Sequence, residues 1–180
     1  MATKIFGDEK IIIREIGKTD KKNAKEFLIF INSLIVEEAK ILMNKKQTLK
    51  DEFAYLDKVT KNMKNKRSVY IVAEHNGKIV GNTSIELNSY RSNHVAKFAI
   101  AILQGYRGIG LGTQLMSEVL QLAKKNINPK PKIIQLEVYA NNKPAIALYK
   151  KMGFKIVAKM PNQIQWNGKL ISEYIMLKYL

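Results

Sequence analysis

The sequence predicts an α/β fold, a three-layer α/β/α sandwich around a mixed, mostly antiparallel central sheet. Strand and helix patterns follow each other in the order β, α, α, β, β, β, α, β, α, β, β. Two Asn-Gly pairs, at 76–77 and 167–168, each lie between two strand patterns and favour hairpins, so most of the sheet should be antiparallel. One crossover helix in the series predicts a parallel pair, with helices on both faces. No repeat, linker or low-complexity tract divides the chain, and we expect one domain over residues 1–180.

The first third of the chain predicts one strand and two helices. Residues 10–16 are apolar and β-branched, as in a strand. From Thr19 and Asp20, which can cap a helix, apolar residues recur at helical spacing as far as Lys46. A second helix is expected from about 48 to 66, with a basic, solvated outer face. Its inner face should bury Phe53, Leu56, Val59 and Met63.

The remaining elements are shorter. Strands are expected at 68–75, 78–87 and 94–103, followed by a glycine-rich turn. The helix after that turn should bury Leu111, Leu115, Val119 and Leu122. A strand at 132–140 and a short helix at 144–152, begun by Asn142 and ended by Gly153, come next, and strands at 154–160 and 169–180 complete the chain.

The glycine-rich turn, Arg107-Gly108-Ile109-Gly110-Leu111-Gly112-Thr113, joins a strand to a helix. Glycines allow several backbone amides to converge on one anion, and the first turn of a helix adds free N–H groups and a positive dipole end. The turn therefore predicts a phosphate or pyrophosphate site, although a tight connection without a ligand is the alternative. It fits neither common nucleotide motif: no Lys precedes Thr113, and the glycines are spaced GxGxG rather than GxGxxG.

Two blocks of the sequence resemble the GNAT superfamily of N-acetyltransferases. Arg107, Gly110 and Gly112 match its coenzyme motif, which is Gln or Arg, two residues, Gly, one residue, then Gly or Ala. About thirty residues later, the segment 136–154 matches the family's second block. The matching residues there are Asn142, Ala145, Leu148, Tyr149, Gly153 and Phe154. The resemblance extends from about residue 10 to the end of the chain and implies the GNAT fold.

The resemblance also implies an acetyl-CoA site. In that fold, the strand ending near 103 and the strand starting near 132 run parallel and splay apart to admit the coenzyme. Backbone groups of Ile100, Ala101 and Ile102 would hold the pantetheine and polarise the thioester carbonyl. The pyrophosphate would lie on Arg107, Gly108, Ile109, Gly110, Leu111, Gly112 and Thr113, and further coenzyme contacts would come from Asn142, Ala145 and Tyr149.

By the same resemblance, Tyr149 is the general acid for the departing thiolate, the alternative being a half-buried packing residue. The base is harder to place, because Lys97 stands where many relatives carry a Glu. Glu137 matches the catalytic Glu of enzymes that acetylate ribosomal-protein N-termini, and the alternative is a strand carboxylate paired with a nearby Lys. Glu86 and His94 are weaker candidates. These residues imply direct transfer of an acetyl group to a primary amine.

Composition restricts the other possibilities. The chain has no Cys and two His, at 75 and 94, so we expect no thiolate chemistry and no metal site. No signal peptide or membrane-spanning run is found, so a cytoplasmic protein is expected. The net charge of +16 could attract nucleic acid, but the lysines are spread along the chain without interleaved aromatic residues. A coenzyme A-binding or RNA-associated module with weak or no catalysis is therefore kept as the alternative function.

The acceptor is not specified by any motif. It could be an amine-bearing small molecule or a protein N-terminus, and a homodimer is compatible with the sequence. A cationic acceptor would need a local acidic patch, for which the candidates are Glu37, Glu38, Asp51 and Glu52. We expect His75 to be exposed next to its hairpin turn, and Trp166 to pack beneath the last hairpin rather than against a substrate.

Overall fold

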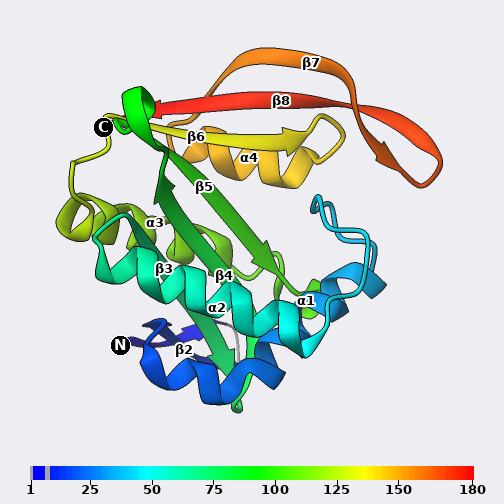
Figure 1. The fold of residues 1–180 in the computed structure, drawn as a ribbon. Coiled ribbons are helices and arrows are strands. Elements are labelled where there is room, and N and C mark those ends of the chain that lie inside the picture. The colour runs from blue at the N-terminus through cyan, green and yellow to red at the C-terminus, as the bar shows by residue number, and fades with distance from the viewer. Residues whose placement is uncertain (1, 7–8) are drawn as a thin grey trace.

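The computed structural model describes residues 2–6 and 9–180, which form an eight-stranded sheet covered by helices on both faces (Figure 1). The strands are β1 (Ala2–Phe6), β2 (Glu9–Glu15), β3 (Ser68–His75), β4 (Lys78–Leu87), β5 (Val95–Ile102), β6 (Ile133–Tyr139), β7 (Lys155–Trp166) and β8 (Lys169–Tyr179). The α-helices are α1 (Ala24–Val36), α2 (Leu49–Lys64), α3 (Leu111–Asn126) and α4 (Lys143–Lys151). Short 3-10 helices are η1 (Lys18–Asn23), η2 (Tyr90–Ser92) and η3 (Gln104–Tyr106).

The strand order is β1-β2-β3-β4-β5-β6-β8-β7, and β5–β6 is the parallel pair among otherwise antiparallel neighbours of the described sheet. Helices α1 and α2 pack on one face through Phe27, Phe30 and Leu56. Helices α3 and α4 pack on the other, where Leu115 and Tyr149 join the larger core. The predicted three-layer arrangement and the mixed, mostly antiparallel sheet are therefore confirmed.

Both Asn-Gly hairpins form as predicted. Asn76 and Gly77 have φ of 50° and 76°, and Asn167 and Gly168 have φ of 50° and 70°. Left-handed conformations at both central residues define the type I′ turn, which fits the twist of the flanking strands. The two hairpins thereby fix the register of β3 with β4 and of β7 with β8.

The N-terminal predictions are wrong in two respects. Strand β1, which pairs with β2 along its whole length, was not expected. The helix predicted from Thr19 to Lys46 is also too long, because η1 replaces its first turn and α1 ends at Val36. At that end, Ala39 N donates to Leu34 O and Glu38 N to Ile35 O, which is a Schellman motif with Glu38 at φ 50° in the place usually taken by glycine.

The second predicted helix is confirmed with small differences. Thr48 and Asp51 form a capping box at the start of α2. Leu56 and Val59 are buried as expected, but Phe53 is 41% exposed and Glu52 is buried in its place. Around α3, Leu111, Leu115 and Val119 are buried, while Leu122 is half-buried against the same core.

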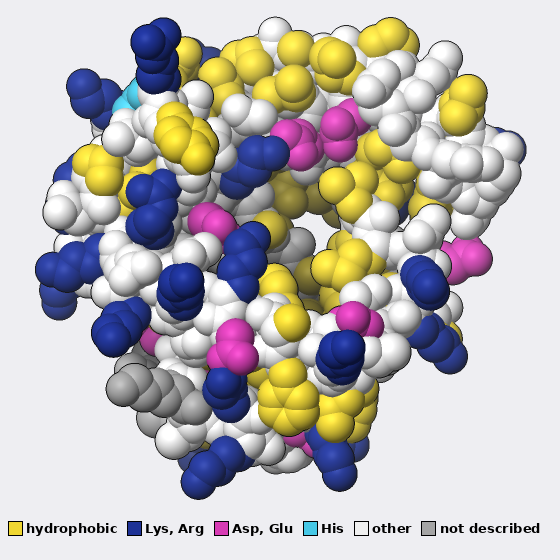
Figure 2. All heavy atoms as spheres, in the orientation of Figure 1, with side chains coloured by type: hydrophobic (Ala, Val, Ile, Leu, Met, Phe, Trp, Pro, Cys, Tyr) yellow, Lys and Arg dark blue, Asp and Glu magenta, His cyan; other side chains and the backbone are white. Residues whose placement is uncertain are grey.

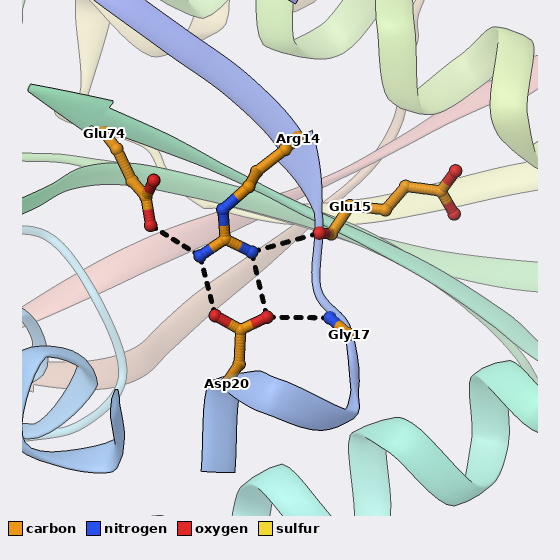
Figure 3. A network of polar contacts seen from close by, with 5 residues as sticks. All are labelled: Arg14, Glu15, Gly17, Asp20 and Glu74. Carbon is orange, nitrogen blue, oxygen red and sulfur yellow. Dashed lines mark hydrogen bonds and ion pairs between the residues drawn. The ribbon is translucent and has the colours of Figure 1, made fainter. Parts of the chain in front are cut away.

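A partly buried ion-pair cluster fastens η1 to the sheet (Figure 3). The Arg14 guanidinium donates to both carboxylate oxygens of Asp20, at 2.8 and 2.6 Å, and to Glu74 at 2.5 Å. Asp20 is 1% exposed and also accepts from Gly17 N at 2.7 Å. Asp20 thus caps η1 rather than the long helix predicted from the sequence.

The described helices include none that is both long and apolar enough to cross a membrane.

Candidate functional site

Strands β5 and β6 separate from each other and open a cavity. Their pairing covers Val95–Lys97 against Ile133–Gln135 and then stops. Beyond that point, residues 98–102 of β5 and 136–139 of β6 line a cavity of about 1020 Å³. Figure 2 shows the opening, edged by hydrophobic side chains with acidic side chains on its rim. The expected splaying of the parallel pair is present.

The glycine turn forms one end of this cavity. Gly108 and Gly110 have φ of 81° and 92°, and Gly110 is the N-cap of α3. An ideal Cβ on either residue would meet no atom within 4 Å, so the space beside the turn is open. The first amides of α3 have no partner within the helix and carry the positive end of its dipole. The turn therefore offers the backbone donors and the room that a pyrophosphate requires.

Gly112 is required for packing as well. A Cβ there would approach Leu148 Cδ2 to 3.0 Å and Ile102 Cδ1 to 3.5 Å. The missing side chain lets the first turn of α3 come close to α4, so that both helices border the cavity.

Arg107 reaches across the mouth of the cavity. Its Nε donates to Ile102 O at 2.7 Å, and its guanidinium forms an ion pair with Glu37 at the end of α1. The other carboxylate oxygen of Glu37 accepts from Gln104 N at 3.2 Å. The Arg107 guanidinium thus pairs with a carboxylate on the opposite wall of the cavity.

Tyr149 lies on α4 and is 8% exposed. Its ring makes an edge contact with Phe98, with 6.0 Å between centroids, and a tilted contact with Phe154 at 6.2 Å. The hydroxyl has no hydrogen-bond partner within residues 2–6 and 9–180, and Tyr149 lines the cavity. Burial raises the pKa of Tyr149 to about 12, so the phenol stays protonated at neutral pH.

Asn142 stands at the N-cap of α4, as predicted, but its side chain makes no capping hydrogen bond. Its backbone N donates to Tyr139 O at 2.8 Å, and the residue lines the cavity together with Ala145. The Asn142 amide is thus available to a ligand.

Glu137 approaches the cavity from the opposite face of the sheet. Leu136 and Val138 point into the α3–α4 core, so strand alternation places Glu137 on the face of α1 and α2. Its carboxylate lies 3.5 Å from Lys97 Nζ and accepts from Gln135 Nε2 at 3.3 Å. The alternative pairing of Glu137 with a lysine is therefore present, and the partner is Lys97 itself.

Glu173 is a second carboxylate on this wall that the sequence did not reveal. It pairs in register with Tyr139, two residues from Glu137, so the two carboxylates are diagonal neighbours on adjacent strands. Burial, followed by the charge of Glu137, raises the pKa of Glu173. Only the order β6-β8-β7 brings Glu173 here, and no local pattern encodes that order.

The segment after α1 forms the remaining wall. Tyr139 Oη donates to Ile41 O at 2.7 Å, and Trp166 Nε1 to Glu38 O at 3.4 Å. Lys40 Nζ lies 5.3 Å from the centre of the Trp166 ring. Trp166 therefore lines the cavity, and the prediction that it packs beneath the last hairpin is wrong.

Most of the predicted site residues lie together on this cavity. They are Ile100, Ala101, Ile102, Arg107, Gly108, Gly110, Gly112, Thr113, Glu137, Asn142, Ala145 and Tyr149. Ile109 and Leu111 do not line it, and the Leu111 side chain is fully buried in the core. Residues that line the cavity but were not predicted include Lys40, Tyr139, Trp166 and Glu173.

Several secondary expectations fail. Glu86 accepts from Asn62 Nδ2 at 2.9 Å, and neither Glu86 nor His94 lines the cavity. His75 is not exposed: its side chain is 15% accessible and lies 2.7 Å from Glu9 and 2.8 Å from Tyr106 Oη.

The four acidic residues expected to form a patch for a cationic acceptor do not all line the cavity. Glu37 and Glu38 line the cavity, whereas Asp51 caps α2. Glu52 is 5% exposed, and burial raises its pKa to about 7. Over the described chain, His, Asp and Glu residues form no group of three that could hold a metal ion.

Comparison with known proteins agrees with this geometry. Residues 35–154 match the acetyltransferase (GNAT) family. An N-alpha-acetyltransferase of Sulfurisphaera tokodaii is 31% identical over 149 residues, which cover 77% of this chain and 86% of that protein. The L-amino acid N-acetyltransferase AaaT of Escherichia coli is 30% identical over 109 residues, covering 60% of this chain and 66% of that protein.

Solved structures show the same architecture. An acetyltransferase of the GNAT family from Streptococcus pneumoniae superimposes with a TM-score of 0.82 at 26% identity, covering 94% of this chain and 99% of that one. The yncA protein of Salmonella typhimurium, solved with its cofactor acetyl-CoA, has the same fold, with a TM-score of 0.79 at 19% identity and 94% of each chain covered. The chain therefore belongs to the acetyltransferase (GNAT) family.

Proposed function

We propose that residues 1–180 act as a single N-acetyltransferase domain that transfers the acetyl group of acetyl-CoA directly to a primary amine. The observation that carries the proposal is the cavity between β5 and β6. It has the open glycine turn at one end, Tyr149 on the α4 side of the sheet and Glu137 on the α1–α2 side. An amine and a departing thiolate need opposite sides of the thioester carbonyl, and this cavity provides a polar group on each side.

The coenzyme is expected to follow β5. The ladder between β5 and β6 ends at Lys97, while β4 continues to pair with the other edge of β5 as far as Ile102. Within the described chain, no strand pairs with the edge of residues 98–102 that faces the cavity, and Arg107 Nε occupies Ile102 O on it. The other N–H and C=O groups of this edge can bond the pantetheine amides as a neighbouring strand would. The pyrophosphate would then lie on Gly108, Gly110 and the first amides of α3.

Tyr149 is proposed to act on the coenzyme sulfur. Its pKa of about 12 keeps the hydroxyl as a donor. A free thiol titrates near 8.5, so complete proton transfer from this phenol would be uphill by about 5 kcal/mol. Tyr149 would therefore stabilise the departing thiolate chiefly through a hydrogen bond that strengthens as charge develops on sulfur.

Glu137 is proposed as the base for the amine, with Glu173 attracting the ammonium form. Glu137 is on the strand that borders the cavity, whereas Glu173 is one strand farther away. Neutralising a lysine-like amine at pH 7 costs about 4.6 kcal/mol, but neutralising a peptide α-amine costs only about 1 kcal/mol. Because Lys97 already engages Glu137, an α-amine suits this base better. Relatives named as an N-alpha-acetyltransferase and an L-amino acid N-acetyltransferase support the same class of acceptor.

The test is calorimetric titration with acetyl-CoA of the parent protein and of Gly110→Asp. A carboxylate at Gly110 would crowd and repel the pyrophosphate, and we expect the affinity to fall by at least about tenfold. Gly77→Asp is the matched control, since Gly77 also has positive φ and open space around it but does not line the cavity. Equal losses in both variants, or no binding by the parent, would contradict the proposed coenzyme site. Release of free thiol on adding peptides or amino acids would then identify the acceptor.

A further inference from the structure

A second cavity, of about 460 Å³, lies where α2 and α3 both end. Lys64, Lys66, Lys125 and Lys130 line it, together with Asn126 and Asn128. Its lining, within the described chain, contains no Asp or Glu. Figure 1 places the two helix ends on the left of the molecule, and Figure 2 shows many Lys and Arg side chains on that flank.

The fold, rather than the sequence, gathers these lysines. Lys64 ends α2 and Lys66 follows it, whereas Lys125 lies in the last turn of α3 and Lys130 follows that helix, some sixty residues later. Asn128 N donates to Lys66 O at 2.8 Å and joins the two loops, while Ile127 is fully buried beneath them. The ammonium groups therefore extend from a backbone that the core holds in place.

The charge of this basic cavity is not neutralised by the protein. Ion pairs among the described residues involve none of the four lysines. Lys130 Nζ donates to Lys125 O at 2.8 Å, which leaves two of its three donors free. Two helix C-termini contribute together only about one negative charge, so four lysines exceed what the dipoles can balance.

We propose that this basic cavity binds the phosphodiester backbone of a nucleic acid. Lysine is a compact, multiply donating cation suited to phosphate oxygens, and the Asn amides add neutral donors. A protein interface usually has exposed aromatic or aliphatic anchors, and firm binding to a membrane surface usually adds apolar side chains that insert to the electrostatic attraction. The apolar lining residues are Met63, which is half-buried, and Ile127, which is fully buried. The two cavities share no lining residue, so binding here leaves the acetyl-transfer site open.

The experiment measures fluorescence anisotropy of labelled 20-nucleotide RNA, with single-stranded and duplex DNA of the same sequence as further probes. The test variant combines Lys64→Gln, Lys66→Gln, Lys125→Gln and Lys130→Gln. The control combines Lys22→Gln, Lys25→Gln, Lys78→Gln and Lys159→Gln, four exposed lysines outside this cavity, and so has the same net charge. Circular dichroism and acetyl-CoA titration confirm that both variants are folded.

At about 0.1 M salt we expect the test variant to bind RNA at least about tenfold more weakly than the parent, and the control to change less than about twofold. With four phosphates contacted, the parent's affinity should fall with a log–log salt slope of about −3, and the test variant's slope should be shallower. If the test variant loses affinity for DNA but not for RNA, or the reverse, that difference identifies the form of nucleic acid that binds. Equal losses in the two variants, or no binding by the parent, would overturn the proposal. It would also be overturned if the test variant lost affinity only for polyglutamate or for anionic lipid vesicles.

Discussion

The guanidinium group of Arg107 forms an ion pair with the carboxylate of Glu37 across the mouth of the large cavity. Arg107 belongs to the glycine turn, whereas Glu37 is the C-cap of α1, where the segment that forms the opposite wall of the cavity begins. If Arg107 turns toward the pyrophosphate of a bound coenzyme, it must give up at least part of this pairing. Coenzyme binding at the glycine turn would then be coupled to Glu37 on the opposite wall of the cavity.

Replacing Glu37 with Gln should strengthen acetyl-CoA binding. A partly exposed ion pair is worth up to about 1 kcal/mol, so freeing Arg107 should lower the dissociation constant by up to about fivefold. The effect should vanish when Glu37→Gln is combined with Arg107→Ala, because no guanidinium is then released. Calorimetry on the four members of this double-mutant cycle provides the measurement. Glu38→Gln, on the same wall but not paired with Arg107, should leave the affinity unchanged.

Glu137→Gln should lower kcat/KM for the amine by at least about tenfold. It should also flatten the acidic limb of the pH–rate profile, as expected for loss of a general base. Glu173→Gln should mainly raise KM, since a nearby charge attracts the ammonium form without receiving its proton. Steady-state rates between pH 5 and 9 distinguish the two. A Glu137→Gln enzyme with an unchanged pH profile would remove Glu137 from the mechanism.

Glu52 should make the fold less stable as pH rises. Burial raises the pKa of Glu52 from 4.5 to about 7. Between these values the folded state holds a proton that the unfolded state has lost, so stability falls with rising pH, by at most roughly 3 kcal/mol. We expect the free energy of unfolding, measured in urea, to fall between pH 5 and pH 8 in the parent protein. It should fall less in Glu52→Gln. Glu15→Gln, at an exposed position, should behave like the parent.

The features that were predictable from sequence are those in which one residue type is required locally. Gly110 adopts φ 92° at the start of α3, and both Asn-Gly pairs adopt left-handed turns, conformations that most side chains disfavour. The end of α1 carries no such signal, because Glu38 takes the left-handed position usually filled by glycine. Apolar residues at helical spacing after Val36 therefore predicted a helix where the chain is irregular.

The wall of the cavity that carries Glu137, Glu173 and Trp166 was less predictable because long-range pairing builds it. Glu173 lies near Glu137 only because β8 inserts between β6 and β7, and Trp166 reaches the cavity through the segment that follows α1. Strand order and loop docking depend on the whole core, so neither position can be inferred from spacing. The coenzyme end, in contrast, is built mainly from one continuous stretch that begins on β5 and enters α3.

Tyr149→Phe should reduce turnover by about a hundredfold while leaving acetyl-CoA affinity within about twofold of the parent. The hydroxyl has no hydrogen-bond partner within residues 2–6 and 9–180, and the ring contacts with Phe98 and Phe154 survive the substitution, so the fold should not change. Because the pKa of Tyr149 is raised to about 12, its ionisation should not limit the rate below about pH 11. Any loss of activity near pH 9 must then come from the ionisation of another group, and the same loss should be seen in Tyr149→Phe. Stopped-flow measurement of thiol release across pH 6 to 10 tests both statements, and an undiminished rate in Tyr149→Phe would show that the thiolate leaves without help from this residue.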